Sequence, residues 1–431
     1  MATAEVALRS PAVGASRAIL ERVAKGYSPR DFAVRFWDGS TWEPDAGGSP
    51  LFTLVLNHAG AVRKMFWPPN GVALAEAYIY GDFDVEGDMP AFLRFCRFLQ
   101  DTPHSRPERV RIGWQLFRLP AEDRPRVGQQ PVQLTGRKHS LERDRQAIGY
   151  AYDTSNDFYG LWLDRDLLYT CAYFETPDDA LDDAQRNKLD LICRKLRLKP
   201  GERLLDIGCG WGALVVHAAK HYGVEAVGVT LSQKQVESAT ARIRAAGLEG
   251  RCKVEYRDYR DVAHLGSFDK VACVGMLEHL GESMFPVFFR GAWDLLKPGG
   301  VFLNHGLTRP ASVPEQKWRK FARKYVFPDG ELQPVSMTLR EAEAAGFEVR
   351  DVESLREHYV LTLTHWLRRL EANREAAVEA VGESTYRVFR LYLAGAQNGM
   401  RVGVYNIHQS LLSKPDSGRT GLPLRRSDWY G

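Results

Sequence analysis

Several features that would define a class of protein are missing from this chain of 431 residues. No Cys-x-x-Cys pair occurs, because the six cysteines are scattered over positions 96, 171, 193, 209, 252 and 273. This argues against a zinc site or a disulfide framework and favours reduced thiols in the cytoplasm. No apolar run approaches the roughly 18 residues of a membrane span, and the first residues lack the apolar core of a signal peptide. We therefore expect a cytoplasmic protein, either soluble or attached to a membrane surface.

A strong charge of one sign is absent as well. The formal net charge is +4, which is too small for us to expect a nucleic-acid partner. The length suits two domains, and a 44% content of hydrophobic residues is typical of globular proteins. Residues 101–148 differ from both flanks, since they carry five prolines and ten Lys or Arg against six Asp or Glu. This stretch is predicted to be a linker that is at least partly extended.

The most informative segment is residues 204–212, Leu-Leu-Asp-Ile-Gly-Cys-Gly-Trp-Gly. Apolar residues lead into glycines at alternate positions, Gly208, Gly210 and Gly212, and a helical pattern follows as far as Tyr222. Glycines at the end of a strand let a nucleotide approach the backbone, because no side chain blocks it. The G-x-G-x-G spacing is typical of S-adenosylmethionine (SAM) methyltransferases, whereas dinucleotide sites have G-x-G-x-x-G. The alternative is a glycine-rich turn that binds nothing.

Strands and helices alternate from about Gly149 onward. We expect helices at 211–222, 232–246 and 285–296, between strands at 203–207, 225–229, 252–256, 270–274 and 301–307. This order predicts a doubly wound α/β domain, a Rossmann-like SAM methyltransferase fold, with its ligand beyond the carboxyl ends of the strands.

The first hundred residues predict a smaller domain of mixed α/β structure. The pattern indicates a strand at 52–56 and helices at 72–80 and 91–99. The expected organisation is therefore a domain at 1–100, the linker at 101–148, the methyltransferase domain at 149–413 and a tail at 414–431.

Polar residues near the strand ends are candidates for holding the cofactor. The second strand ends at Thr230 without the acidic residue that often binds ribose hydroxyls in nucleotide folds. Thr230 and Gln235 are the polar groups available there, and Asp258 follows the third strand, where it can hold the adenine amino group. The alternative for Thr230 is that it only caps the helix that begins near residue 232.

Seven segments of the chain, in order, resemble the cyclopropane-fatty-acyl-phospholipid synthase family. The resemblance covers roughly residues 149–413, and Glu76-Ala-Tyr-Ile-Tyr-Gly-Asp-Phe-Asp resembles the lipid-facing N-terminal domain of that family. The matching segments are Tyr169-Thr-Cys-Ala-Tyr-Phe, Leu205-Asp-Ile-Gly-Cys-Gly-Trp-Gly, Gly228-Val-Thr-Leu-Ser, Asp258-Tyr-Arg-Asp, Gly275-Met-Leu-Glu-His, Leu303-Asn-His and Lys324-Tyr-Val-Phe-Pro-Asp-Gly.

The resemblance implies transfer of a SAM methyl group to the double bond of an unsaturated phospholipid acyl chain at the inner membrane face. Proton loss from the resulting carbocation to bound bicarbonate would close a cyclopropane ring. The implied bicarbonate ligands are Cys171 (through its backbone), Glu278, His305, Leu307 and Tyr359. Tyr169, Thr170 and Asp206 join the expected SAM contacts. Some relatives instead form a methylene branch, which a separate reductase can convert to a methyl branch.

The residue types fit this chemistry without the resemblance. His305 and Tyr359 can donate hydrogen bonds to an anion, Glu278 can accept one, and a lining of aromatic rings can shield a cation from water. The alternatives are a surface pair for Glu278 and His279, a structural role for His305 and a core position for Tyr359. One departure is Gly306-Leu307, where the family often has Thr-Ile after the histidine.

Residues 317–327, Lys-Trp-Arg-Lys-Phe-Ala-Arg-Lys-Tyr-Val-Phe, combine basic and aromatic side chains. Trp318, Phe321 and Tyr325 share one face of a helix, which suits an anionic membrane surface, and a lid over the active site is the alternative.

Three hypotheses remain: an enzyme of phospholipid acyl chains, a methyltransferase for a small molecule or soluble acyl carrier, and a non-catalytic lipid-binding protein. A homodimer is also compatible with the sequence.

Overall fold

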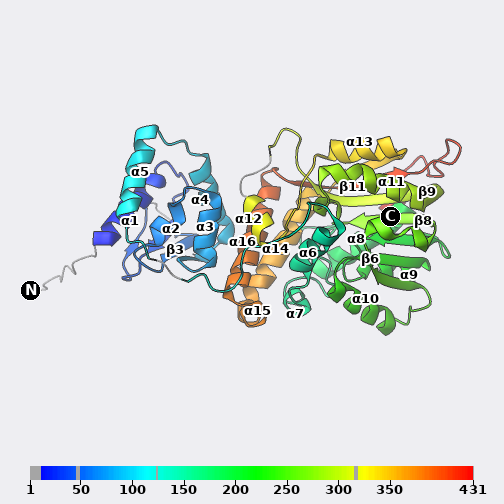
Figure 1. Cartoon of the computed structure of the whole chain (residues 1–431), viewed down its shortest axis with the longest axis horizontal. Coiled ribbons are helices and arrows are strands. Elements are labelled where there is room, and N and C mark those ends of the chain that lie inside the picture. The colour runs from blue at the N-terminus through cyan, green and yellow to red at the C-terminus, as the bar shows by residue number, and fades with distance from the viewer. Residues whose placement is uncertain (1–10, 45–48, 123–124, 315–318, 431) are drawn as a thin grey trace, which may run out of the picture. The chain divides into compact units, whose positions relative to one another are not determined.

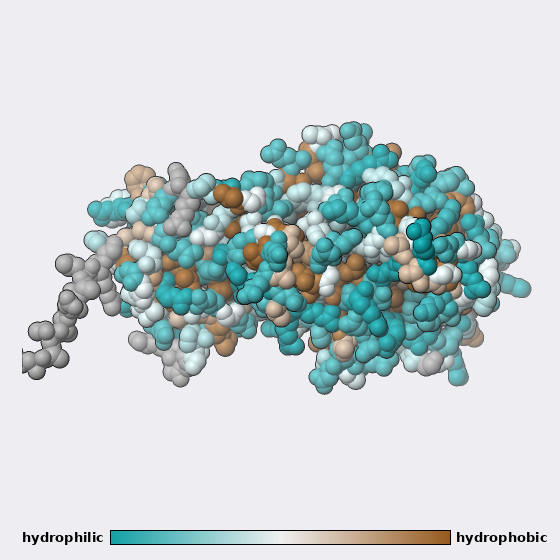
Figure 2. Space-filling model, turned by 90° about the horizontal axis from the view of Figure 1, so that it is seen from below, coloured by the Kyte–Doolittle hydropathy of each residue, from teal (hydrophilic) through white to brown (hydrophobic). Residues whose placement is uncertain are grey.

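The structure is a computed structural model that describes residues 11–44, 49–122, 125–314 and 319–430. The chain divides into two compact units (Figure 1). The first unit comprises residues 1–130, 317–321 and 382–398, and the second comprises 131–316, 322–381 and 399–431. Hydrophilic side chains cover most of the face shown in Figure 2, with smaller hydrophobic areas between them.

The first unit is built on a four-stranded sheet in the order β2-β1-β3-β4. β1 and β3 are parallel and the other pairs antiparallel. Buried rings of Phe32, Phe52, Phe92 and Phe95 pack between the sheet and α4. The strands are β1 (Phe32–Arg35), β2 (Thr41–Trp42), β3 (Phe52–Leu56) and β4 (Phe83–Gly87), and the helices are α1 (Pro11–Val23), α2 (Ala61–Phe66), α3 (Gly71–Ile79), α4 (Met89–Asp101) and α5 (Arg106–Arg118).

A helix from late in the chain completes this unit. Residues 382–398 include most of α16 (Glu383–Arg401). Arg387 donates to the Tyr78 carbonyl at 2.9 Å and to Asp84, and Arg390 donates to the Val85 carbonyl at 2.9 Å. These buried guanidinium groups satisfy backbone carbonyls of α3 and β4 that water cannot reach.

The second unit contains a seven-stranded sheet in the order β10-β11-β9-β8-β5-β6-β7, in which β11 alone is antiparallel to its neighbours. Helices pack on both faces of this sheet (Figure 1). The strands are β5 (Arg203–Ile207), β6 (Glu225–Thr230), β7 (Cys252–Tyr256), β8 (Phe268–Val274), β9 (Leu296–Thr308), β10 (Glu348–Ser354) and β11 (Asn406–Ser413). The helices include α6 (Leu141–Tyr152), α7 (Asn156–Gly160), α8 (Leu181–Leu196), α9 (Ala213–Tyr222), α10 (Gln233–Ala245), α11 (Phe285–Leu295), α12 (Arg319–Tyr325), α13 (Val335–Ala345), α14 (Arg356–Ala372) and α15 (Arg374–Val381).

This topology confirms the predicted doubly wound fold and locates its crevice. The chain leaves β5 toward β6 and β7, and then returns to β8 on the opposite side of β5. Ligands of such sheets bind outside the carboxyl ends of the strands, where the strand order reverses. Asp206 pairs with Gly228 of β6 and Ala272 of β8, so it stands at this reversal. All five strands predicted in this unit are present.

Two segments differ from their predictions. Residues 101–148 are more regular than a linker, since they contain α5 and the first part of α6, which begin at the N-caps Ser105 and Ser140. Proline at the second position of α5 is compatible with a helix, because the first turn has no N–H to lose. The aromatic residues Phe321 and Tyr325 of α12 are buried, so they pack against protein, and residues 315–318 lie outside the described structure.

No helix in the described ranges combines the length and the apolar character that crossing a membrane requires.

Candidate active site

A cavity of about 140 Å³ lies at the carboxyl ends of β5, β6 and β8. Gly275 and Met276, which directly follow β8, line it, as do Tyr152 and His279. Gly212 instead packs against Ala239 of α10, where an added Cβ would stand 2.9 Å from that side chain. The other residues expected to contact the cofactor all line this cavity, namely Tyr169, Thr170, Asp206, Gly208, Gly210, Thr230, Gln235 and Asp258.

The glycine turn after β5 leaves space in this cavity at one position. Gly208, Gly210 and Gly212 have φ values of +78°, +54° and +79°, which L side chains rarely adopt. A Cβ on Gly208 would stand 2.7 Å from the Met276 side chain, whereas one on Gly210 would meet nothing within 4 Å. Gly210 is therefore the glycine whose missing side chain leaves room for a ligand.

Asp206 is the acidic residue buried at the base of the cavity. Burial raises the pKa of its carboxyl group to about 7, although the Lys188 ammonium opposes the rise. Its Oδ1 is inaccessible to solvent and has no hydrogen-bond partner among the described residues. Such an atom is a ready acceptor for a polar group of a bound ligand.

Lys188 is a residue of the cavity wall that the sequence patterns did not reveal. It is fully buried on α8, and its Nζ donates to Thr170 Oγ1 at 2.8 Å. Burial lowers the pKa of this amine to about 8, against the opposing effects of Asp164, Cys171 and Asp206. It resembles any other lysine of an amphipathic helix, and only tertiary packing brings it under the cavity.

Thr230 is not the cap of α10. Ser232 is the N-cap residue, because its side chain accepts from the Gln235 backbone N–H. The Thr230 hydroxyl instead lies 2.6 Å from Gln235 Oε1, and both side chains are buried at the cavity wall. Thr230 is therefore not the N-cap residue, although its hydroxyl also accepts from the Ser232 backbone N–H at 3.3 Å, and Thr230 and Gln235 form one polar patch at the end of β6.

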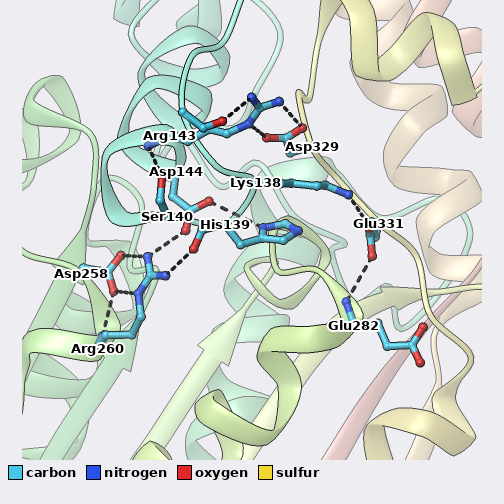
Figure 3. Close-up of polar contacts among 11 residues, drawn as sticks. Lys138, His139, Ser140, Arg143, Asp144, Asp258, Arg260, Glu282, Asp329 and Glu331 are labelled. Carbon is cyan, nitrogen blue, oxygen red and sulfur yellow. Dashed lines mark hydrogen bonds and ion pairs between the residues drawn. The ribbon is translucent and has the colours of Figure 1, made fainter.

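Asp258 belongs to a network of charged residues beside the cavity (Figure 3). Its two oxygens accept from Arg260 at 2.6 and 2.8 Å, and Arg260 also donates to Asp144 at 2.7 Å. Across the network, Arg143 pairs with Asp329, and Lys138 pairs with Glu331. These contacts connect residues 138–144, which include the first turn of α6, to the segments that follow β7 and α12. Asp258 lines the cavity, but Arg260 already occupies part of its acceptor capacity.

Glu278 and His305 lie at neighbouring strand ends. Glu278 follows β8 in a short 3₁₀ helix (Leu277–His279), and His305 lies near the end of β9, whose Leu307 backbone N–H donates to the Glu278 carboxylate. Burial raises the pKa of Glu278 to about 7 and lowers the pKa of His305 well below its ordinary value. Glu278 Oε2 and His305 Nε2 are inaccessible to solvent and have no hydrogen-bond partner among the described residues.

The remaining residues implied by the resemblance lie on nearby segments. Cys171 is fully buried, its sulfur lies 3.7 Å from the Leu355 carbonyl, and burial raises the pKa of its thiol. An uncharged buried thiol is a poor nucleophile, so its backbone is the part suited to a ligand. Tyr359 is buried in the first turn of α14, with its ring edge toward Trp366 at 5.9 Å.

Aromatic rings enclose the space on one side of the cavity. The Tyr152 hydroxyl is hydrogen-bonded to His279 Nε2 at 2.8 Å. The ring centroids of Tyr152 and Tyr169 are 6.3 Å apart. The Tyr169 ring contacts Trp162 and Trp366 at 5.0 and 5.2 Å between centroids. Such rings exclude water and present negative faces to a cation. The aromatic surroundings expected from the sequence are therefore present.

Two family models match the chain. Residues 139–410 match the family described as mycolic acid cyclopropane synthetase, and residues 19–98 match a domain of unknown function. A probable fatty acid methyltransferase of Pseudomonas putida is 38% identical over 92% of this chain and 95% of its own length. Another from Mycobacterium tuberculosis is 35% identical over 93% and 95% of the two chains.

Solved structures agree with these matches. The cyclopropane synthase MmaA2 from Mycobacterium tuberculosis has a TM-score of 0.60 and 32% identity, over 62% of this chain and 97% of its own. The mycolic acid cyclopropane synthase CmaA1 complexed with SAH and CTAB also has a TM-score of 0.60. It is 33% identical, over 62% of this chain and 97% of its own.

The fold and the glycine-lined cavity define the chain as a SAM-dependent methyltransferase. It belongs to the mycolic acid cyclopropane synthetase family, whose model covers more than half of the chain. It is an enzyme of the cyclopropane fatty acid synthase type.

Proposed function

We propose that the enzyme methylates the double bond of unsaturated fatty-acyl chains in membrane phospholipids and produces cyclopropane fatty acids. The observation that carries this proposal is the pair of buried polar atoms on Glu278 and His305 for which the described residues provide no hydrogen-bond partner, beside the cavity of a SAM methyltransferase. The names of its relatives, fatty acid methyltransferases and cyclopropane synthases, support the same substrate class.

The reaction needs a dry site with a weak base. An alkene carbon is a poor nucleophile, so it must be held close to the methyl group that SAM supplies. Transfer leaves a carbocation on the neighbouring alkene carbon, and loss of a proton from the new methyl group closes the ring. Rings such as Tyr169 and Trp366 suit the cationic stage, because they exclude water.

Bicarbonate fits the unpartnered atoms as the base, because it carries both a hydroxyl donor and negatively charged acceptor oxygens. Glu278 Oε2 can accept its hydroxyl hydrogen, and a protonated His305 Nε2 can donate to its oxygens. Cys171 and Tyr359 are the further proposed contacts, and bicarbonate supplies the proton acceptor when bound. The methylene-branched product, with its partner reductase, is the alternative, because it arises from the same cation after a hydride shift.

Purified protein incubated with SAM and dioleoyl phospholipid vesicles tests the proposal. Both products add one CH₂ to oleate, so mass alone does not separate them. Proton NMR of the released methyl esters does, because ring protons resonate upfield of the chain methyls and an exocyclic methylene gives vinylic signals. Vesicles of fully saturated phospholipid are the control. Exocyclic-methylene signals without ring signals would overturn the cyclopropane assignment, and an unmodified acyl chain would overturn the substrate class.

We also propose that α5 contacts the membrane that holds the substrate. Val110, Trp114 and Phe117 follow one another at helical spacing and are 72%, 58% and 73% exposed, and the nearby Trp67 is 57% exposed. The Arg118 guanidinium lies 4.2 Å from the Trp114 ring centroid, and the exposed Arg111 flanks the same stripe. An aromatic stripe bordered by arginines suits an anionic lipid surface, where each cation contributes about 1 kcal/mol.

Co-sedimentation with phosphatidylglycerol vesicles tests this surface. A Trp114→Ser, Phe117→Ser variant should pellet less than wild type, and a matched pair of exposed sites, Tyr256→Ser with Val287→Ser, should not. Replacing Lys320, Arg323 and Lys324 by Gln tests the basic segment separately. Equal pelleting of the α5 variant and wild type would contradict the proposal, and a changed oligomeric state of that variant would assign the stripe to a second copy.

A further inference from the structure

The other ring nitrogen of His305, Nδ1, faces the amide of Gln409. In the register of β9 and β11, His305 pairs with Gln409 on the adjacent strand. Gln409 Nε2 lies 3.3 Å from His305 Nδ1, and both side chains are buried. The two histidine nitrogens therefore differ: Nδ1 has an amide neighbour, whereas Nε2 has no partner among the described residues.

A buried lysine sets the orientation of that amide. Lys195 of α8 lies with its Nζ 2.8 Å from Gln409 Oε1. An ammonium group can only donate hydrogen bonds, so it must face the carbonyl oxygen of the amide and not its NH₂ group. Lys195 is held in turn by an ion pair with Glu353 of β10 and by Asp351 at 4.0 Å. The amide NH₂ group of Gln409 is thereby directed at His305.

We propose that Lys195 and Gln409 are positioning residues that hold His305 in the tautomer with its proton on Nε2. An amide NH₂ can only donate, so Nδ1 must accept and cannot carry the proton of a neutral ring. The hydrogen on Nε2 then points away from Gln409, as a donor for an anion on the side of the ring where the described residues offer no hydrogen-bond partner. The role of this donor rests on the proposed bicarbonate site, whereas the tautomer itself does not.

The charges around the ring favour the neutral form. Lys188 and Lys195 approach from α8, His408 lies on β11, and His358 lies on α14. Burial comes first among the causes that lower the pKa of His305, and the electrostatic effects of these four groups, foremost Lys188 and Lys195, act in the same direction. A doubly protonated ring would also direct an N–H at the Gln409 amide hydrogens, which the observed arrangement does not accommodate.

Nitrogen-15 NMR of cofactor-free protein labelled at histidine tests the tautomer directly. The shifts of the two ring nitrogens distinguish a protonated Nε2 from a protonated Nδ1, and the His305 signals are those missing from a His305→Asn variant. Wild type should show a protonated Nε2 and an unprotonated Nδ1. A wild-type ring with its proton on Nδ1, or with both nitrogens protonated near neutral pH, would overturn the proposal without any variant.

A Gln409→Glu variant gives the complementary test. A carboxylate at this position keeps a partner for Lys195 but accepts a hydrogen bond, so it should move the proton of His305 to Nδ1 or protonate both nitrogens. Turnover should fall about tenfold or more while the KM for SAM stays unchanged, because Gln409 does not line the SAM cavity.

Ser410→Ala is the matched control, since Ser410 is the next buried residue of β11 and lies on the opposite face of the sheet. It should leave the nitrogen shifts and turnover at wild-type values. An unchanged His305 tautomer in the Gln409→Glu protein would contradict the positioning role. Absence of any acyl product from a wild-type protein with the expected tautomer would count against the proposed function alone.

Discussion

Replacing Glu278 by glutamine should separate catalysis from stability. The carboxyl group is buried, and burial raises its pKa from 4.5 to about 7. The folded protein therefore holds this proton more tightly than the unfolded chain does. Stability is lost as the pH rises, because ionising the group costs more in the folded state than in water. Glu278→Gln removes the ionisation and nearly preserves the shape.

The size of the effect follows from the two pKa values. The pKa of Glu278 is 4.5 in the unfolded chain and about 7 in the folded protein. As the pH rises from 5 to 8, wild type should therefore lose about 2.5 kcal/mol of unfolding free energy relative to the variant. Any constant penalty of the amide group, such as an unsatisfied N–H, cancels in this pH difference. Most of this loss of stability should occur between pH 4.5, the pKa of the carboxyl group in the unfolded chain, and pH 7, with little further change at higher pH.

Urea titrations of cofactor-free wild type and Glu278→Gln in CO₂-free buffers at several pH values measure this difference. The variant should bind SAM with wild-type affinity by calorimetry, because Glu278 does not line the SAM cavity. Its turnover should fall by about 10² or more, the usual scale for acid–base groups. Parallel stability curves for the two proteins from pH 5 to pH 8 would refute the buried, proton-holding state of Glu278, and near-normal turnover would refute its catalytic role.

Three further outcomes are expected. Gly210→Val should abolish SAM binding in calorimetry, because the new side chain enters the open space of the cavity. It should keep its secondary structure by circular dichroism but lose thermal stability, because a φ of +54° is strained for a β-branched residue. Depleting bicarbonate should slow wild type in a product assay, and adding it back should restore the rate. Gly306→Ala should retain turnover and thermal stability, because its Cβ would lie 3.5 Å from Leu277 and 3.8 Å from Glu278 Oε2, which are ordinary contact distances. Lost turnover in that variant would show that the glycine is required beside the carboxylate.

The sequence predicted the central strands well because each has a strong local signal. β5 and β7 begin and end at the predicted residues, since β5 is a short, mostly apolar run and β7 alternates between apolar and charged residues in its first four positions. These strand ends determine where Asp206, Thr230 and Asp258 lie, so the pattern placed these three residues around one cavity; their contacts with the cofactor remain a prediction. The roles of Cys171 and Tyr359 came only from the family resemblance, because no spacing rule connects residues so far apart in the chain.

What escaped prediction depends on tertiary packing. β11 carries His408, Gln409 and Ser410 in its middle, and both of its faces are largely covered, so the alternation of an exposed strand is absent. Lys188 and Lys195 lie on an amphipathic helix and are buried only because α8 packs under the sheet. The pattern of α16 indicates a helix, but nothing in it specifies that its arginines pair with residues of the first unit.

The same burial that makes this site costly to fold makes it suitable for its proposed chemistry. In water, Glu278 would be ionised and His305 would be partly protonated at neutral pH. Burial shifts the pKa of the carboxyl group upward and that of the imidazole downward, so both groups approach neutrality together. A weakly charged donor and acceptor can hold a small anion through hydrogen bonds, as the proposed bicarbonate would require. In the proposed mechanism, the rings around Tyr169 exclude water, so the bound anion and not a water molecule would accept the proton of the new methyl group.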